Sequence, residues 1–215
     1  MIKLYKLEEP QLLKDNKQSW TSEYIKLKSS NASVPDNLKF KYRHPMIKSQ
    51  IKKETHDKCA YCESKVSHVC PGDVEHILPK KHCQDLIFEW RNLTLSCEQC
   101  NRTRKNDYYN PQEPLINPYV DNPAEHLMAL GPMIFHRPGD KKGELTEKII
   151  ELNRKELIER RKERLESLIN LADKWANESN IVLKEILKKQ LLKEAEEDKE
   201  YSFIVKQFLE NSRVI

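Results

Sequence analysis

The stretch from residue 59 to residue 106 decides the fold of this chain. It begins with Cys59-Ala-Tyr-Cys62, continues through Asp73-Val-Glu-His-Ile-Leu-Pro-Lys80, and ends with Trp90-Arg-Asn-Leu-Thr-Leu-Ser-Cys97-Glu-Gln-Cys100-Asn101 and the five residues after it. Two C-x-x-C pairs therefore enclose a segment of 34 residues. Zinc takes four ligands in tetrahedral array, and two such pairs supply them. The spacing predicts a zinc knuckle formed by all four cysteines; the alternative is that they are simply small buried residues.

Size and composition limit the classes of protein to which the chain belongs. Its 215 residues are 38% hydrophobic and 33% charged, and the mean hydropathy is -0.80. No apolar run approaches the roughly 20 residues that span a bilayer, and the first residues lack the apolar stretch of a secretory signal. We therefore expect a cytoplasmic protein without membrane contact. Thiols stay reduced in that compartment, which favours metal ligands over disulfides for the paired cysteines.

Positive charge is concentrated around the cysteines. The formal net charge is only +4, but residues 38–110 carry 14 Lys and Arg against nine Asp and Glu. A basic surface at this place is what the binding of a polyanion needs. Ordinary scatter of surface charge is the alternative, and a zinc ion held by four thiolates subtracts about two charges.

Four segments are expected along the chain, and together they predict an α+β fold. Residues 1–37 are expected to form a strand followed by a helix, and residues 38–110 a compact core held by the metal. Residues 111–150 are predicted to be a loop-rich connector with short strands, because most of the prolines and glycines lie there. Residues 151–215 lack Pro and Gly and repeat apolar residues at three- and four-residue steps. This pattern predicts a C-terminal bundle of two or three amphipathic helices.

Within the core, a β-hairpin and two short helices are expected. Pro71-Gly72 predicts a turn, and a short strand follows from Val74. Its hairpin partner is predicted at residues 93–95. Helices are expected to begin near His44-Pro45 and to cover residues 100–106, the latter as a short exposed helix.

These motifs together resemble the HNH endonuclease superfamily, whose active site has the ββα-metal arrangement. An acid and a His followed by Ile-x-Pro, then Asn-Leu, then C-x-x-C-Asn is a specific combination. The chain is most similar to the subgroup with a zinc knuckle, which includes the PtuB subunit of Septu-type and retron-linked anti-phage systems. The specific motifs cover residues 59–106, and a weaker likeness extends through residues 114–118 and 152–154.

The resemblance implies roles for five residues. His76 is implied as the general base that takes a proton from the attacking water, since an unperturbed pKa of about 6.5 leaves its neutral form available at pH 7. Glu75 takes the acid position and Asn101 the third motif position, both as oxygen ligands of a catalytic Mg²⁺ or Mn²⁺ ion. Asp73 either shares this role or lies behind the ligands. Asn92 matches the middle Asn, which braces the loop and helps to orient the base.

Each of these residues also has a non-catalytic interpretation. A His near a strand is often a hydrogen-bonded core residue, acids at a strand end are often solvated, and Asn often forms or caps a turn. Many relatives have Asp where this chain has Glu75, so the longer side chain puts the ligand geometry in question. His68, Cys70, His82 and Cys83 leave a second zinc site open, with packing or surface roles as the alternative.

The implied reaction is hydrolysis of a phosphodiester bond of double-stranded DNA, with 5′-phosphate and 3′-hydroxyl products. A cation between Glu75 and Asn101 stabilises the charge that develops on the leaving oxygen. Five basic residues beside the motif are expected to hold neighbouring phosphates: Lys80, Lys81, Arg102, Arg104 and Lys105. The likeness to Septu further implies an ABC/SMC-like, PtuA-like ATPase subunit as partner, docked on the N-terminal helix and the C-terminal bundle.

Two other classes of protein stay open. One is a non-catalytic, zinc-dependent nucleic-acid-binding or regulatory protein, for which His76→Ala leaves the biological activity intact while Cys59→Ala destroys the fold. The other is a helical adaptor in which zinc is only a staple, and for this class no DNA affinity is expected even at low salt.

Overall fold

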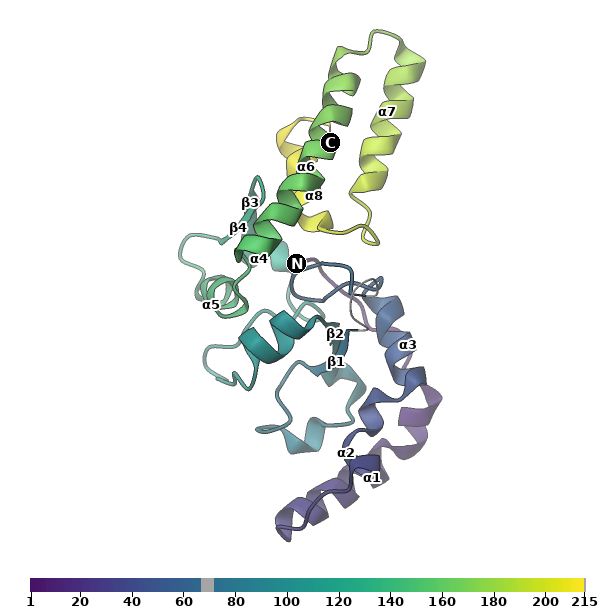
Figure 1. Ribbon diagram of the computed structural model, residues 1–215, viewed down its shortest axis with the longest axis vertical. Helices are drawn as coiled ribbons and strands as arrows, with labels where there is room; N and C mark the ends of the chain where they lie inside the picture. The colour runs from purple at the N-terminus through teal and green to yellow at the C-terminus, as the bar shows by residue number, and fades with distance from the viewer. Residues whose placement is uncertain (67–71, 215) are drawn as a thin grey trace.

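The computed structural model describes residues 1–66 and 72–214. The molecule is elongated, with the N-terminal helices at one end, a β-hairpin in the middle and a pair of long helices at the other end (Figure 1). In chain order the elements are α1 (Gln11–Ser29), α2 (Asp36–Lys39), η1 (Lys41–Arg43), α3 (Pro45–Glu54), β1 (Asp73–His76), η2 (Gln84–Leu86), η3 (Trp90–Asn92), β2 (Leu93–Ser96), η4 (Gln99–Lys105), α4 (Pro123–His126), β3 (Leu127–Leu130), β4 (Met133–His136), α5 (Lys141–Ile150), α6 (Lys155–Asn177), α7 (Ile181–Glu194) and α8 (Ser202–Asn211).

The N-terminal part has the predicted helices but not the predicted strand. α1 begins directly after Pro10, whose ring fixes φ near the helical value, here -56°. α3 begins at Pro45, where the side chain of His44 accepts a hydrogen bond from the amide of Met46. Residues 1–10 form no strand. The amide of Leu4 donates to the carbonyl of a loop residue, Pro118 (2.8 Å), which is an isolated bond rather than a ladder.

Side chains hold residues 1–10 on the core in place of a β-ladder. The indole N–H of Trp90 donates to the carbonyl of Leu7 (3.0 Å), and the ammonium of Lys6 lies 4.3 Å from the centre of the Trp90 ring. Glu54, at the end of α3, accepts from Lys6 (3.1 Å) and from the amide of Leu7 (2.8 Å). Lys6 is therefore placed between a carboxylate and an aromatic face, both of which stabilise a cation.

The predicted hairpin is present in the middle of the molecule. β1 pairs antiparallel with β2, with Glu75 opposite Thr94 and His76 opposite Leu93. Leu93 and Leu95 are fully buried, so β2 anchors the hairpin in the core. β1 therefore carries the acid and the His of the motif on a strand that is held from behind by apolar packing.

The connector contains a second small hairpin and a helix that was not predicted. β3 pairs antiparallel with β4, and Gly131 takes the turn between them with φ +58°, a conformation that glycine adopts without strain. α5 follows, capped by Asp140, which accepts a hydrogen bond from the amide of Gly143 (2.6 Å). A Cβ atom at Gly143 would overlap the carbonyl oxygen of His126. The glycine thus permits close packing inside a helix, whereas the sequence favoured a loop.

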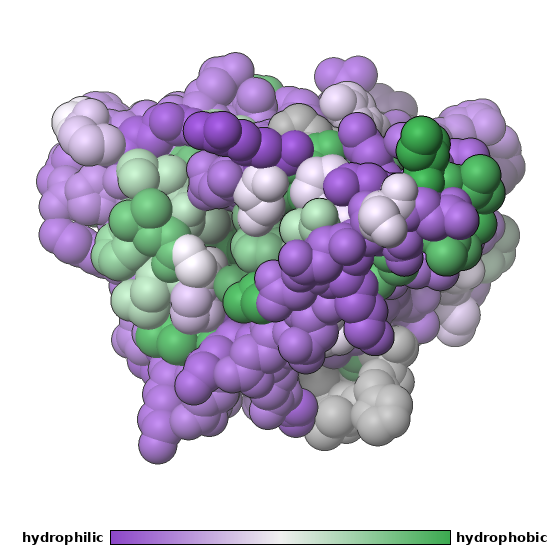
Figure 2. Space-filling model, turned by 90° about the horizontal axis from the view of Figure 1, so that it is seen from above, coloured by the Kyte–Doolittle hydropathy of each residue, from purple (hydrophilic) through white to green (hydrophobic). Residues whose placement is uncertain are grey.

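The C-terminal bundle forms as three helices, α6, α7 and α8. α8 packs into the core through Phe203, Ile204, Val205 and Leu209, and one apolar cluster extends from Met1 to Val214. α6 and α7 run side by side as a projecting hairpin (Figure 1). Seen along the long axis of the molecule, hydrophobic groups reach the surface among hydrophilic ones (Figure 2). Within the described residues, no helix is both long and apolar enough to cross a membrane.

Candidate functional site

The four paired cysteines meet at the base of the β-hairpin. The sulfur atoms of Cys59, Cys62, Cys97 and Cys100 all lie within 4.8 Å of one another, and none of the four is in a disulfide. The amide of Ala60 donates to the carbonyl of Leu95 in β2 (2.9 Å), which attaches the first pair to the hairpin. Four thiols in one cluster fit the ligand set of a structural zinc ion.

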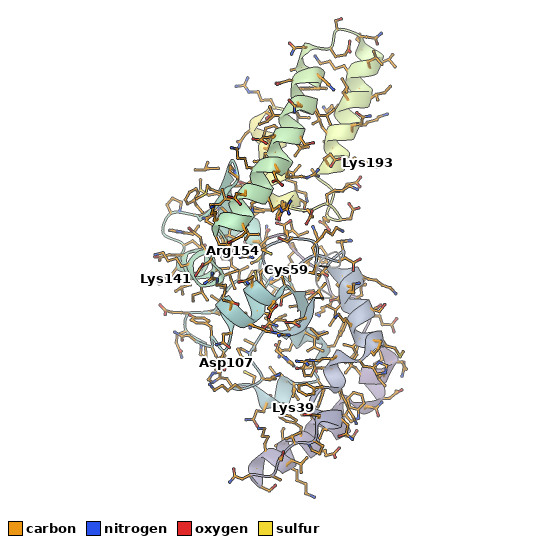
Figure 3. The ribbon with its side chains drawn as sticks, viewed as in Figure 1. Lys39, Cys59, Asp107, Lys141, Arg154 and Lys193 are labelled. Carbon is orange, nitrogen blue, oxygen red and sulfur yellow. The ribbon has the colours of Figure 1, made fainter. Side chains whose placement is uncertain are left out.

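Arg154 connects the C-terminal half of the chain to this cluster. Its guanidinium donates to Sγ of Cys100 at 3.6 Å, and Arg154 and Cys59 lie where the helical half meets the core (Figure 3). A cation at this place offsets the negative charge of thiolates. The side chain of Asn153 pairs with both backbone groups of Ile134 in β4, at 2.8 Å and 2.6 Å. The 152–154 stretch therefore joins the cysteine cluster, β4 and the start of α6.

A polar hollow of about 180 Å³ brings the residues of the HNH-like motif together. Its walls include Asp73, Glu75 and His76 from β1, Asn101 from η4, and Tyr42 and Lys80. η4 is a wide π-helix, and the amide of Asn106 donates to the carbonyl of Asn101, five residues earlier, at 2.7 Å. Cys100 and Lys105 on η4 are buried, so the expectation of an exposed helix over residues 100–106 is wrong for these two positions.

His76 is held as a neutral base. Its Nε2 lies 2.9 Å from the carbonyl oxygen of Ile87, and a carbonyl only accepts, so Nε2 carries the proton and Nδ1 has the lone pair. Burial lowers the pKa of His76 to about 4; the bond to Ile87 opposes this, and the positive charge of Lys80 adds to it. The edge of the Tyr42 ring packs on the imidazole, with the ring centres 4.5 Å apart. The imidazole is therefore uncharged and fixed in orientation at pH 7.

Glu75 is paired with Lys105 in the interior. Oε1 of Glu75 lies 2.6 Å from Nζ of Lys105, which also donates to the carbonyl of His76 (2.9 Å). Burial raises the pKa of Glu75, and the charge of Lys105 opposes that rise. Because Lys105 is only 3% exposed, the prediction that it contacts phosphates is wrong. It ties the end of η4 to β1 instead.

Asp73 and Asn101 contact each other at the edge of the hollow. Nδ2 of Asn101 donates to Asp73 (3.2 Å), and Arg102 binds both carboxylate oxygens of Asp73 at 2.9 Å. This orientation directs the amide oxygen of Asn101 away from Asp73, as an acceptor for another ligand. In the described chain, the cysteines alone bring three or more Cys, His, Asp or Glu ligand atoms within 4.8 Å. A catalytic ion held by Glu75 and Asn101 therefore stays a prediction.

Asn92 supports the site from below and does not line the hollow. Its Oδ1 accepts from the amide of Leu78 (2.7 Å), and its Nδ2 donates to the carbonyls of Leu78 (3.0 Å) and Leu86 (3.2 Å). These bonds fix the loop between β1 and η3, which contains Ile87, the partner of His76. The bracing role that the motif implies for Asn92 stays a prediction, and these contacts are compatible with it.

The remaining predicted cations have different environments. Lys80 lines the hollow and donates to the hydroxyl of Tyr42 (2.9 Å). Lys81 is exposed beside Asp107 (3.3 Å), and Arg102 is exposed beside Asp73. Arg104 pairs with Glu151 after α5 (2.6 Å), so its charge already has a partner within the chain.

Sequence reasoning missed Tyr42 and Arg43, which reach the hollow from η1. The Lys41-Tyr42-Arg43 run, basic residues around an aromatic one, is the signal that it did not use. Cys83 is buried apart from the cysteine cluster, and His82 stacks on Tyr109 with ring centres 5.1 Å apart. His68 and Cys70 lie outside the described residues, so the second zinc site stays an open prediction.

Comparison with known proteins defines the class to which this site belongs. The model of the HNH endonuclease family matches residues 59–107, which contain both cysteine pairs, the hairpin and η4. The centre of the chain is therefore an HNH endonuclease domain with a four-cysteine cluster.

Two curated relatives extend the match beyond this domain. The Septu protein PtuB of Bacillus mycoides (strain KBAB4) is 30% identical over 194 residues, which cover 75% of this chain and 66% of the relative. The Septu protein PtuB of Bacillus thuringiensis is 31% identical over 182 residues, which cover 78% of this chain and 70% of the relative. The chain belongs to the PtuB family of HNH proteins and spans about two thirds of the length of these relatives.

Proposed function

We propose that this chain is a metal-dependent nuclease that hydrolyses phosphodiester bonds of DNA, with His76 as the general base. The observation that carries the proposal is the state of His76 in the polar hollow. Its Nε2–H is used by Ile87, its pKa is lowered to about 4, and Nδ1 is left to accept a proton from water. His76 lies in the wall of a polar hollow together with two carboxylates and an amide, which favours a catalytic role over a purely structural one.

Glu75 and Asn101 would hold the catalytic Mg²⁺ or Mn²⁺ ion, and Asp73 orients Asn101 through its amide nitrogen. When bound, such an ion supplies positive charge for the leaving oxygen of the phosphodiester. Lys105 fixes the carboxylate of Glu75 at the floor of the hollow. Lys80 and Arg102 line the hollow, and the exposed Lys81 follows Lys80 in the chain; all three are proposed to contact phosphates on either side of the scissile bond. The products expected are 5′-phosphate and 3′-hydroxyl ends.

Zinc is proposed as the structural ion of the four-cysteine cluster, on the basis of its donor set. With zinc bound, the knuckle fixes the two ends of the segment that contains β1 and β2. Its part in the reaction is therefore the placement of η4 and β1 relative to each other.

We further propose that the chain is a cytoplasmic effector subunit of an anti-phage system and works with an ABC/SMC-like, PtuA-like ATPase. Exposed apolar side chains on α7, among them Ile181, Val182 and Ile186, support a docking role for the projecting hairpin. Co-purification with the neighbouring ATPase is expected for the wild type and is expected to be lost in the double variant Val182→Asp, Ile186→Asp. Leu130→Asp, at an exposed apolar position on β3, is the matched control that should keep the complex.

The test of the nuclease proposal compares the wild type with His76→Ala, each with the ATPase, on plasmid DNA in Mg²⁺ or Mn²⁺. Loss of a general base typically lowers the rate about 10²–10⁴-fold, and EDTA should abolish cleavage by the wild type. His56→Asn is the control, because His56 lies outside the hollow and has φ +53°, which Asn tolerates. Equal cleavage by His76→Ala and wild type would show that the chain is not a nuclease of this kind, whereas no cleavage by either would favour a non-catalytic zinc-dependent nucleic-acid-binding or adaptor protein.

A further inference from the structure

A second hollow, of about 240 Å³, is lined in part by residues that directly follow or precede those of the polar hollow in the chain. In the segment after β1, His76 and Lys80 line the polar hollow, and Ile77 and Leu78 between them line the second. The turn after η4, which carries the labelled Asp107 (Figure 3), alternates in the same way: Asp107 lines the polar hollow and Tyr108 the second. The two hollows therefore meet along these two segments of chain, and other segments complete each of them.

Lys105 connects the two hollows. It lines the second hollow, and its Nζ contacts Glu75, which lines the polar one. A ligand in the second hollow and a phosphate in the polar hollow would therefore lie on the two sides of one side chain.

The lining of the second hollow suits a flat ring. Tyr108, Tyr109, Pro111 and Pro114 contribute aromatic and flat apolar surface, and Ile116 lies among the lining residues. The ring of Tyr109 is held nearly parallel to that of His82, at an angle of 14°. The volume is slightly below the range of about 300–1,000 Å³ in which whole drug-sized ligands bind. One ring system fits this space better than an entire nucleotide.

Tyr61, whose buried hydroxyl has no hydrogen-bond partner in the described chain, also lines this hollow. Tyr61 belongs to the first C-x-x-C pair and is 2% exposed, and no group in the described chain forms a hydrogen bond with its hydroxyl. Buried polar groups in folded proteins almost always have a partner. The orphan hydroxyl therefore indicates a ligand with a polar edge rather than a purely apolar one.

We propose that the second hollow receives one unpaired nucleobase of the strand whose phosphate lies in the polar hollow. This inference rests on the proposed nuclease function and specifies its substrate, namely a strand with an unpaired or extruded nucleotide beside the scissile phosphate. A base offers a flat face for Tyr109 and a polar edge for the hydroxyl of Tyr61, which are the two ways in which proteins hold an extruded base. An apolar side chain of a partner protein would leave the Tyr61 hydroxyl unpaired.

Binding to defined duplexes tests the inference without any cleavage. The probes are a fully paired DNA duplex, the same duplex with one bulged 2-aminopurine, and the same bulge with an abasic site, each bound to the full chain carrying His76→Ala. We expect the bulged base to bind about tenfold more tightly than the other two, a gain typical of one base–aromatic stack. The fluorescence of 2-aminopurine is expected to fall on binding because its ring stacks. Ribonucleotide versions of the three probes show which sugar the site prefers.

Two variants connect the effect to the hollow. Tyr61→Phe and Tyr109→Ala are each expected to reduce the preference for the bulged base about five- to tenfold, with unchanged affinity for the paired duplex. Tyr61→Phe should keep or raise the melting temperature, because it removes an unpaired buried hydroxyl, so a loss of preference cannot be attributed to a damaged fold. Tyr5→Phe, at an exposed tyrosine, is the matched control and should change nothing.

Equal affinity for all three probes, or an equal loss on paired and bulged DNA in both variants, would overturn the base-binding inference. These outcomes leave the nuclease proposal standing, since cleavage of paired DNA that depends on His76 would survive them. Conversely, cleavage that is unaffected by His76→Ala removes the proposed nuclease mechanism but does not alter the binding preference. The two failures are therefore distinguishable.

Discussion

The HNH core and the α6–α7 hairpin are stabilised in opposite ways. In the core, charged and polar side chains are buried in pairs: Glu75 with Lys105, and His76 with the carbonyl of Ile87. In the hairpin, large apolar side chains are exposed instead, and Ile181 is 79% accessible. α7 buries only Leu191 fully within its described length.

The difference shows where the structure of each region comes from. The core depends on a few groups that are distant in sequence and close in space, so the loss of one leaves a buried charge or an incomplete ligand set. The hairpin depends on many local contacts along a helical period, each of modest energy. Substitutions should therefore be costly in the core and mild on the exposed face of the hairpin.

The largest effect is expected for Cys59→Ser. Loss of one zinc ligand should unfold the core, since structural zinc sites contribute about 10–16 kcal/mol of apparent binding free energy in small domains. Metal content by atomic emission and thermal melting by circular dichroism measure this. Cys83→Ser is the matched control, because Cys83 is buried outside the cluster and one zinc per chain should remain. Unchanged melting and metal content in Cys59→Ser would contradict a zinc-dependent core.

A smaller but still large effect is expected for Lys105→Ala. Removing one partner of a buried ion pair leaves the Glu75 carboxylate without its counter-charge, which costs about 3–5 kcal/mol. Lys81→Ala breaks the exposed pair with Asp107 and should cost less than about 1 kcal/mol. Urea unfolding of both variants gives the two free energies. Similar costs for the two lysines would mean that the interior pair does not differ from a surface pair.

Within the hairpin, two positions on α7 should separate packing from exposure. Leu191→Ala creates a cavity at a fully buried site and should cost about 2–5 kcal/mol. Ile186→Ala, at a position that is 47% exposed, should cost less than about 1 kcal/mol in the isolated chain. The same unfolding measurement compares them. A cost at Ile186 as large as that at Leu191 would show that the outer face of α7 is packed within the chain itself.

The smallest effect is expected at Asp140, in the connector between the two regions. Burial acts to raise the pKa of Asp140, but the hydrogen bonds from the Gly143 amide and from His126 outweigh it and lower the pKa. A depressed carboxyl pKa contributes stability above its unfolded value of about 3.9, and this stability is lost as the pH falls through the folded value.

Asp140→Ala should therefore cost about 0.5–2 kcal/mol at pH 7, as loss of a helix cap does, and less at pH 3. Asp140→Asn keeps a capping oxygen and should cost less than Asp140→Ala. Urea midpoints at the two pH values measure both differences. A gap between wild type and Asp140→Ala that is equal at pH 7 and pH 3 would rule out the charged cap.

Much of the fold follows from local patterns in the sequence. The paired cysteines, the strands around Val74 and Leu93, the helix that starts at Pro45 and the C-terminal helices all lie where spacing and periodicity predicted them. The prediction of an N-terminal strand was wrong, because contacts of Lys6 and Leu7 with Trp90, rather than a β-ladder, hold residues 1–10 on the core. α5 was missed because its glycine indicated a loop, although the close approach of the His126 carbonyl requires a glycine there.

The candidate site likewise has some features that the sequence predicted and others that it did not. Motif spacing selected His76, Glu75, Asp73 and Asn101, and these four line one hollow; their catalytic roles stay predictions. The sequence did not indicate that Lys105 turns inward to Glu75 or that Arg154 reaches Cys100. Both contacts join segments that are about 30 residues or more apart, and no local pattern encodes such a separation.

By itself, the sequence determined the two C-x-x-C pairs, the strand that carries the acid and the His, and the helical character of the last 60 or so residues, because each depends on neighbours within a few positions. The tertiary structure alone decided which charges are buried, which nitrogen of His76 holds the proton, and where the second hollow opens. Those features depend on desolvation and on contacts between distant segments, which exist only after the chain has folded.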